Sequence, residues 1–439
     1  MTQKHHRKWT VLVYTMADEP ALRKAANGTL EQIASTQARD DIKIAMQVTL
    51  SAKSPNQSDI RLFDFESAST FCSTGIKTDR LNHLRYTPEP NLNPKANLTR
   101  FLHWGATTYP AQHYCVVLQG HAWGADYRMP SLSVQSSGTS PRVIHQRCRL
   151  IFGNPASKNR LTNKELALAI GASGYKFDIL GLDSCLMCMV EICYQLRHCA
   201  RYLIAPEGYG PIRGWPFNRI LSSLTSHPQI LPEDFGRHIL TEYSRTYFTF
   251  DGNIRLTISL CDLRHAEQLV KAMRSLVTTL IHSMKSNELF RDQIIKIRNH
   301  SAHYGLPAYV DLREFCQQLR QAVSDNATRI KCTNVIDAIS RRFIVKYALT
   351  RHRKNSFGLS IYFPNWQIGR HNRVNPNVRY GRFHFVVATP QSFAIAETDI
   401  REAYTEHDFA DTTNWMRFLI LFLRSREVKA NHTKTSQGT

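Results

Sequence analysis

The stretch Phe177-Asp-Ile-Leu-Gly-Leu-Asp-Ser-Cys-Leu-Met-Cys-Met-Val-Glu191 decides how this chain is organised. Its apolar run, 177–182, has the length of a buried strand and ends in the polar pair Asp183-Ser184. Apolar residues at helical spacing follow at once. We therefore expect Cys185 to lie where a strand turns into a helix, a position at which backbone N–H groups favour a thiolate over a thiol.

A second strand-like run predicts where the base for such a nucleophile lies. The segment His113-Tyr-Cys-Val-Val-Leu-Gln-Gly-His121 is apolar in its centre and ends in Gly-His. Parallel strands of an α/β sheet present functional groups in the crevice at their carboxyl ends. We expect His121 and Cys185 to meet at one edge of the sheet.

The first half of the chain alternates between strand and helix signals. Strands are expected at 9–14, 42–50 and 60–65, and a helix is expected with Asn93 as its N-cap and Pro94 as its first residue. Thr162-Asn-Lys-Glu165 has the pattern of a capping box. This alternation predicts an α/β protein, a parallel-rich sheet flanked by helices (α/β/α).

Four more motifs extend the pattern: Trp9-Thr-Val-Leu-Val-Tyr-Thr-Met-Ala-Asp18, Tyr109-Pro110, Gly214-Trp215-Pro216 and Gly358-Leu-Ser-Ile-Tyr-Phe-Pro364. Taken in order with the histidine at one strand end and the Asp-Xaa-Cys at the next, they span roughly 9–366. The chain thereby resembles the clostripain family of cysteine endopeptidases, in the caspase-like clan. The resemblance implies a caspase-like fold and hydrolysis of peptide bonds by a thiol.

The resemblance also assigns catalytic roles. Cys185 would be the nucleophile, and His121 the general base and then the general acid. The backbone N–H groups of Ala122 and Cys185 would bind the oxyanion. Ala122 departs from the family's glycine, and alanine would cost roughly 1–2 kcal/mol there if a left-handed conformation is required.

Two acidic residues are candidates for substrate binding. The resemblance places Asp183 in the primary specificity pocket, where its charge would select arginine or lysine through a charge-assisted pair. The alternative is that Asp183 only caps the following helix. Glu207 is a weaker candidate for the wall of the same pocket. The expected partner is a protein or peptide substrate with a basic residue at the cleavage site.

A long polar segment, 126–160, separates the two catalytic candidates and is expected to be either a functional loop or disordered. In the family, cleavage at a basic residue in this region matures the enzyme. The candidate processing sites here are Arg128, Arg142, Arg147, Arg149, Lys158 and Arg160.

Composition changes suggest four regions. A basic tail, 1–8, precedes a caspase-like catalytic domain, 9–225. A C-terminal α/β portion, 226–428, is expected to pack on that domain, and a polar tail, 429–439, follows it.

Two other readings compete for the cysteine motif. Cys185-Leu-Met-Cys188 has the spacing of a thiol-disulfide pair, although nothing else in the chain is typical of thioredoxins. Together with His198 and Cys199 it suggests zinc, but a structural zinc site needs four converging ligands. A catalytically inactive, protease-like binding scaffold is the third alternative, because of the His121-Ala122 departure.

Composition limits the remaining possibilities. The formal charge of +21 favours acidic partners, yet the basic residues are spread along the chain and no nucleic-acid-binding motif accompanies them. Ten cysteines at irregular spacing indicate a reducing compartment. There is no signal-peptide pattern and no apolar run long enough for a membrane span. We expect a cytoplasmic protein, or one exported without a recognisable signal. The chemistry requires no cofactor; calcium would follow from the family resemblance only, and the chain has no Asp-rich calcium loop.

Overall fold

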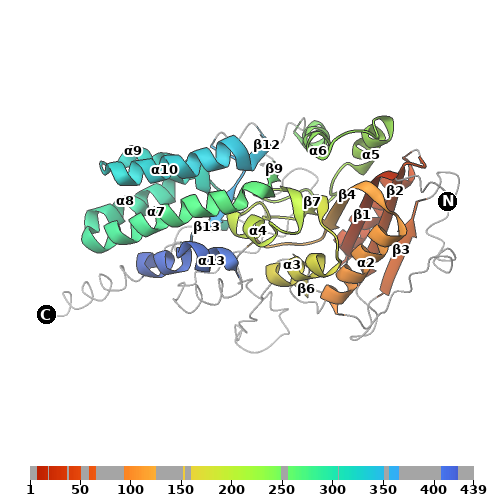
Figure 1. The fold of residues 1–439 in the computed structure, drawn as a ribbon, viewed down its shortest axis with the longest axis horizontal. Coiled ribbons are helices and arrows are strands. Elements are labelled where there is room, and N and C mark those ends of the chain that lie inside the picture. The colour runs from red at the N-terminus through yellow and green to blue at the C-terminus, as the bar shows by residue number, and fades with distance from the viewer. Residues whose placement is uncertain are drawn as a thin grey trace, which may run out of the picture.

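The computed structural model describes residues 7–17, 19–36, 39–50, 59–65, 93–124, 152–153, 160–248, 256–304, 306–350, 355–364 and 407–423. These residues form a central twisted sheet with helices on both faces (Figure 1). The predicted α/β/α architecture is confirmed.

An eight-stranded sheet runs through the described part of the chain. In spatial order its strands are β12 (Ile344–Leu349), β9 (Thr257–Asp262), β8 (Ala200–Ala205), β7 (Phe177–Asp183), β4 (Ala111–Gln119), β1 (Arg7–Ala17), β2 (Ile42–Leu50) and β3 (Asp59–Asp64). The strands from β8 to β2 are parallel, and β9, β12 and β3 join at the edges as antiparallel strands. Because β9 and β12 follow residue 225, one sheet is continuous across the predicted domain boundary.

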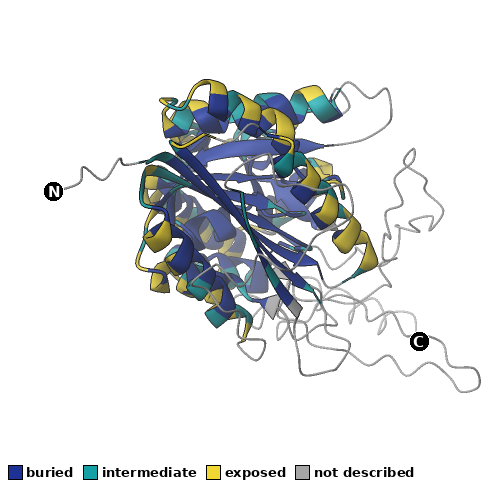
Figure 2. Cartoon of the chain, turned by 90° about the vertical axis from the view of Figure 1, so that its right-hand side faces the viewer, coloured by how far each residue is buried: buried dark blue, intermediate teal, exposed yellow. Residues whose placement is uncertain are grey.

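Side chains of β1 alternate between the two faces of the sheet, as the period of a strand requires. Trp9, Val11 and Val13 pack into one apolar core, and Leu12 and Tyr14 pack into the other. The strands are buried between helices whose outer surfaces are exposed (Figure 2). A sheet covered on both faces explains why its strands read as continuous apolar runs.

The helices divide between these two cores. The first face is covered by α1 (Pro20–Ala34), α5 (Phe217–Ser226) and α6 (Pro232–Tyr247). The second face is covered by α2 (Pro94–Thr108), α3 (Asn163–Ala172), α4 (Val190–Gln195) and α7 (Ala266–Ser286). The predicted caps hold: Asn93 Oδ1 accepts from Ala96 N at 2.8 Å, and Thr162 with Glu165 forms a capping box.

The later part of the chain adds helices that extend beyond the sheet (Figure 1). They are α8 (Glu288–His300), α9 (Leu312–Ala322), α10 (Asn326–Ala338) and the short α13 (Asp408–Thr413). A small antiparallel sheet joins β10 (His303–Tyr304), β11 (Leu306–Asp311) and β13 (Ser360–Tyr362). Among the described helices, none combines the length and the apolar character needed to cross a bilayer.

The structure describes part of the predicted N-terminal tail and none of the predicted C-terminal tail. β1 begins at Arg7, inside the predicted basic tail, whereas the predicted tail 429–439 lies outside the described residues.

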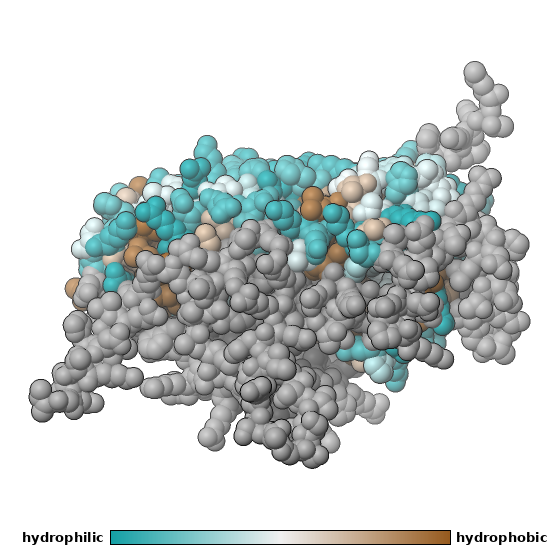
Figure 3. Space-filling view, turned by 90° about the horizontal axis from the view of Figure 1, so that it is seen from below, coloured by the Kyte–Doolittle hydropathy of each residue, from teal (hydrophilic) through white to brown (hydrophobic). Residues whose placement is uncertain are grey.

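The described part of the face in Figure 3 is mostly hydrophilic, with small apolar areas. Large exposed apolar side chains, such as Leu231 and Leu289, come from separate elements.

Candidate active site

Three neighbouring parallel strands end at the same edge of the sheet. Thr15 of β1 pairs with Gln119 of β4, and Gln119 pairs with Asp183 of β7. His121 lies two residues beyond Gln119, and Cys185 lies two residues beyond Asp183. The histidine and the cysteine thus follow adjacent strand ends at one edge of the sheet, the edge at which the sequence predicts that they meet.

The segment after β7 differs from the predicted strand-to-helix junction. Residues 184–189 form a turn, and α4 begins only at Val190. The reason is that the neighbouring loop binds this segment: Leu186 N donates to Gly208 O and Cys188 N donates to Pro206 O, both at 2.9 Å. The prediction of a helix N-terminus at Cys185 is wrong, so no helix dipole activates the thiol.

Leu186, directly after the cysteine, adopts a left-handed conformation with φ of 63°. This conformation is uncommon for a residue with a branched side chain. Leu186 is nevertheless fully buried, and its N–H is held by Gly208. Packing and this hydrogen bond therefore hold Leu186 in a strained conformation directly after Cys185.

Cys185 is half-buried, and its thiol contacts the loop after β8. Gly210 N donates to Cys185 Sγ at 3.4 Å. Burial raises the pKa of Cys185 to about 11; the Gly210 hydrogen bond opposes this shift and the Asp183 charge adds to it. In this arrangement the thiol stays protonated at neutral pH. A proton acceptor is therefore needed to make it a nucleophile.

His121 turns toward the end of β1. Its Nε2 lies 2.5 Å from Glu19 Oε1, and both side chains are about one-third exposed or less (28% and 34%). Within the described residues, no hydrogen bond joins His121 to Cys185. Sequence reasoning missed Glu19, although its place just after the first strand was a usable signal.

The alanine after the histidine is not strained. Among the described residues other than glycine, only Leu186 and Asn414 have a positive φ, so Ala122 is not left-handed and the anticipated cost does not arise. Tyr309 Oη donates to Trp123 O and helps to hold the segment. Neither the Ala122 N–H nor the Cys185 N–H donates a hydrogen bond to another described residue. Both N–H groups are free to serve as donors.

Two donors hold Asp183 at the mouth of the sheet, by which we mean the carboxyl ends of β4 and β7. Gln119 Nε2 at 2.8 Å and Trp215 N at 2.9 Å both donate to its Oδ2. The alternative that Asp183 caps a helix is therefore wrong. Gly214 allows this arrangement, since a Cβ there would lie 2.6 Å from Oδ2. Burial raises the pKa of Asp183 to about 6, against the two hydrogen bonds.

Gln119 is a second residue that sequence reasoning missed. Its Oε1 accepts from Thr15 Oγ1 at 2.8 Å, which orients the amide so that its nitrogen faces Asp183. Asp183 Oδ1 makes no hydrogen bond to the described residues. One carboxylate oxygen is thus anchored and the other remains available.

Glu207 does not belong to this mouth. Its side chain is fully buried, and its Oε2 accepts from Ser356 Oγ at 2.7 Å and from Gly358 N at 3.2 Å. Burial, followed by the nearby Asp311 carboxyl, raises the pKa of Glu207 well above its usual value. The carboxyl supports the 356–358 loop from inside, which argues against its predicted role in the wall of the pocket.

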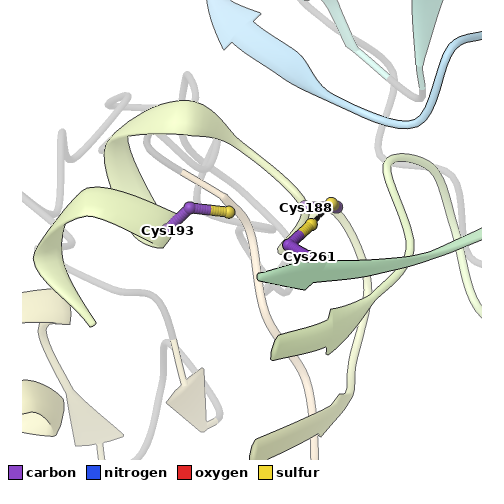
Figure 4. A group of neighbouring side chains, drawn as sticks. All are labelled: Cys188, Cys193 and Cys261. Carbon is purple, nitrogen blue, oxygen red and sulfur yellow. Dashed lines mark hydrogen bonds between the residues drawn. The ribbon is translucent and has the colours of Figure 1, made fainter. Parts of the chain in front are cut away.

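Cys188 is buried in the core, and its sulfur contacts other residues than the sulfur of Cys185 does. Its Sγ is 3.6 Å from that of Cys261 (Figure 4). The same sulfur lies 3.1 Å from Gly358 O. Cys188, Cys193 and Cys261 bring their sulfurs within 4.8 Å of one another, and all are buried. Burial raises the pKa of Cys193 and of Cys261 well above the usual range. The paired-thiol reading of Cys185 and Cys188 finds no support here.

The candidate processing sites fall largely outside the described residues; this applies to Arg128, Arg142, Arg147, Arg149 and Lys158. Arg160 begins β6 (Arg160–Leu161), which pairs with β5 (Phe152–Gly153).

A layered sheet with a cysteine and a histidine at adjacent strand ends defines a protein of the caspase-like cysteine peptidase class. Comparison with known proteins narrows this class: the sequence profile of the clostripain family, peptidase family C11, matches residues 74–419. The chain belongs to the clostripain family and is a cysteine endopeptidase.

Individual relatives are distant but extensive. Clostripain of Hathewaya histolytica is 19% identical over 422 residues, covering 82% of this chain and 75% of that protein. A secreted C11 cysteine protease of Bacteroides thetaiotaomicron, solved with an irreversible peptide inhibitor, has a TM-score of 0.57 at 16% identity and covers 93% of this chain and 99% of that one. An inactive zymogen C11 protease of Parabacteroides distasonis has a TM-score of 0.56 at 16% identity, covering 94% and 99%. These structures share the fold.

Proposed function

We propose that this enzyme hydrolyses peptide bonds after arginine or lysine, with Cys185 and His121 as its catalytic dyad. The observation that carries the proposal is the register of β4 and β7. It places the histidine and the cysteine at equivalent positions beyond two adjacent strand ends, with Asp183 at the base of the cysteine turn.

The reaction follows from these groups. His121 accepts the proton of the Cys185 thiol, and the sulfur attacks the carbonyl carbon of the substrate. The N–H groups of Ala122 and Cys185 stabilise the oxyanion, and the imidazolium protonates the leaving amine as the C–N bond breaks. Water, deprotonated by His121, then attacks the thioester, and the thiol and the carboxylic acid are released.

The resting geometry explains why substrate is needed for this chemistry. Cys185 has a raised pKa and His121 is bonded to Glu19 in the described structure. Hydrogen bonds of catalytic pairs are often long before substrate binds and tighten in the complex. We propose that bound substrate displaces water from the strand ends and shortens the contact between Cys185 and His121, which adds to the fraction of thiolate already present in the free enzyme.

Asp183 would select the basic residue. Its Oδ2 is fixed by Gln119 and Trp215, which leaves Oδ1 to receive a guanidinium or an ammonium group. Arginine can form two parallel hydrogen bonds to a carboxylate, while lysine acts as a single charged donor. The pair would hold the carboxylate ionised when substrate is bound.

The remaining expectations form part of the same proposal. The mechanism requires no cofactor, and the basic segment 126–160 supplies sites for self-cleavage. The described cysteines are free thiols, which supports action in a reducing compartment as an alternative to export.

The test uses fluorogenic peptides ending in arginine, lysine or aspartate, with Cys185→Ala, His121→Ala and the control Cys199→Ala. We expect cleavage of the basic peptides only, a loss of about a thousandfold or more in the first two variants and little change in the control. Intact mass before and after incubation reports self-cleavage.

Two outcomes would contradict the proposal. Unchanged turnover in Cys185→Ala would exclude the dyad. No cleavage of any basic peptide, even after the 126–160 segment has been nicked with trypsin, would favour the inactive scaffold.

A further inference from the structure

Glu19 and His121 are 102 positions apart in sequence, yet their side chains meet at 2.5 Å. The sheet brings them together, because β1 lies directly beside β4. In spatial order, β1, β4 and β7 therefore deliver Glu19, His121 and Cys185 to one edge. A thiol, a candidate base and an acid that could orient the base thus follow three neighbouring strands.

Glu19 occupies the N-cap position of α1 but does not cap the helix. Its carbonyl accepts from Arg23 N at 3.0 Å, whereas its carboxylate makes no hydrogen bond to the first turn. In the same protein, Asn93 and Thr162 use their side chains to cap α2 and α3. A short Ser, Thr, Asp or Asn would stabilise α1 better than Glu19 does. Its longer side chain contacts His121 instead, so the helix loses a stabilising cap. Such local losses of stability are found at functional sites.

The charge of this contact is also informative. The hydrogen bond from His121 lowers the pKa of Glu19, and burial opposes this shift only in part. The Glu19 carboxylate is therefore ionised at neutral pH. An ionised carboxylate stabilises the imidazolium that forms when the thiol loses its proton. The charged side chains on the adjoining elements make other contacts: Arg23 on α1 donates from Nε to Ala17 O at 3.4 Å, and Asp183 at the end of β7 accepts from Gln119.

We propose that Glu19 is a positioning residue for His121: it accepts the Nε2–H, fixes the tautomer, and leaves Nδ1 to take the proton of Cys185. The inference rests on the proposed function of the Cys185–His121 dyad. Because Glu19 acts through His121 and lies away from Asp183 in the sheet order, it should affect the chemical step and not the selection of basic substrates.

The experiment compares Glu19→Gln and Glu19→Asp with Glu31→Gln, a control at an exposed position of the same helix. We expect Glu19→Gln to lower kcat for the arginine peptide about tenfold to a hundredfold at nearly constant KM. Glu19→Asp should recover part of the loss, since it keeps the charge, and Glu31→Gln should match the unmodified protein. Thermal unfolding of each variant checks that the fold is intact.

A second readout needs no turnover. Iodoacetamide alkylates the thiolate, so its rate at Cys185, followed by intact mass with Cys185→Ala as the blank, reports activation directly. Glu19→Gln should slow this rate at pH 7, because the imidazolium that balances the thiolate loses its partner.

The outcomes separate the two proposals. If the unmodified protein cuts no peptide, the proposed function fails, and the alkylation rates still decide the role of Glu19. If the unmodified protein is active and Glu19→Gln matches it in kcat and alkylation, the positioning role is overturned. An increase in either quantity would also overturn it, and would make the contact inhibitory.

Discussion

Two cysteines three positions apart have opposite surroundings. Cys185 lies at the edge of the sheet, partly exposed, with Gly210 N as the donor to its sulfur. Cys188 is fully buried and lies against Cys261 and Gly358. The turn between them carries the chain from the site into the core. Position relative to the strand ends, more than residue type, therefore decides which thiol can react.

Two carboxyl groups, those of Asp183 and Glu207, differ in the same way as the two thiols. Asp183 lies at the mouth with one oxygen available, and Glu207 lies in the interior with its neighbours from the 356–358 loop. Changes at the edge should alter activity with little effect on stability. Changes in the interior should alter stability and leave the activity of each folded molecule unchanged.

Beyond the Cys185 and His121 variants, the largest effect is expected from Asp183→Asn. Asparagine keeps an oxygen for the Gln119 and Trp215 donors but removes the charge that would bind a basic substrate. We expect kcat/KM for arginine peptides to fall about a hundredfold, with the unfolding midpoint nearly unchanged. Steady-state kinetics and thermal unfolding on the same preparations measure both. Equal rates in the variant and the unmodified protein would remove Asp183 from the pocket.

An interior change should show the opposite behaviour. Cys261→Ala removes a fully buried sulfur from the cluster with Cys188 and Cys193. The cavity that remains should lower the free energy of unfolding by about 1–2 kcal/mol, measured with urea. Activity per folded molecule, from active-site titration, should stay within twofold. A large loss of activity here would show that the core cluster and the site are coupled, and the contrast would fail.

The amino-acid sequence predicts most of the sheet and the strand ends that carry His121 and Cys185. The apolar runs before Asp183 and His121 are strong strand signals, and the capping box at Thr162 sets a helix start, because these features depend on neighbouring residues. The turn at 184–189 could not be predicted this way. Its hydrogen bonds come from the loop at 206–210, so the helical spacing after Cys185 was misleading.

The other missed contacts also depend on strand order. Gln119 meets Asp183, and Glu19 meets His121, only because β4 lies between β1 and β7. The sequence contains each residue at a strand end, but it does not state which ends are neighbours. Once the histidine and cysteine strands are placed side by side, the remaining neighbour of β4 identifies where an acidic partner should be sought.

The smallest effect concerns the ionisation of Asp183. Burial raises its pKa to about 6 in the free enzyme, so the carboxyl gains a proton as the pH falls through that value and loses its attraction for a guanidinium. The ratio of kcat/KM for an arginine peptide to that for its uncharged citrulline analogue isolates this charge, since both peptides use the same dyad. We expect the ratio to fall about fourfold between pH 7.5 and pH 5.5 in the unmodified protein, as the ionised fraction falls. In Asp183→Asn it should not change with pH. A ratio that stays constant in both proteins would show that the charge at the mouth of the sheet does not choose the substrate.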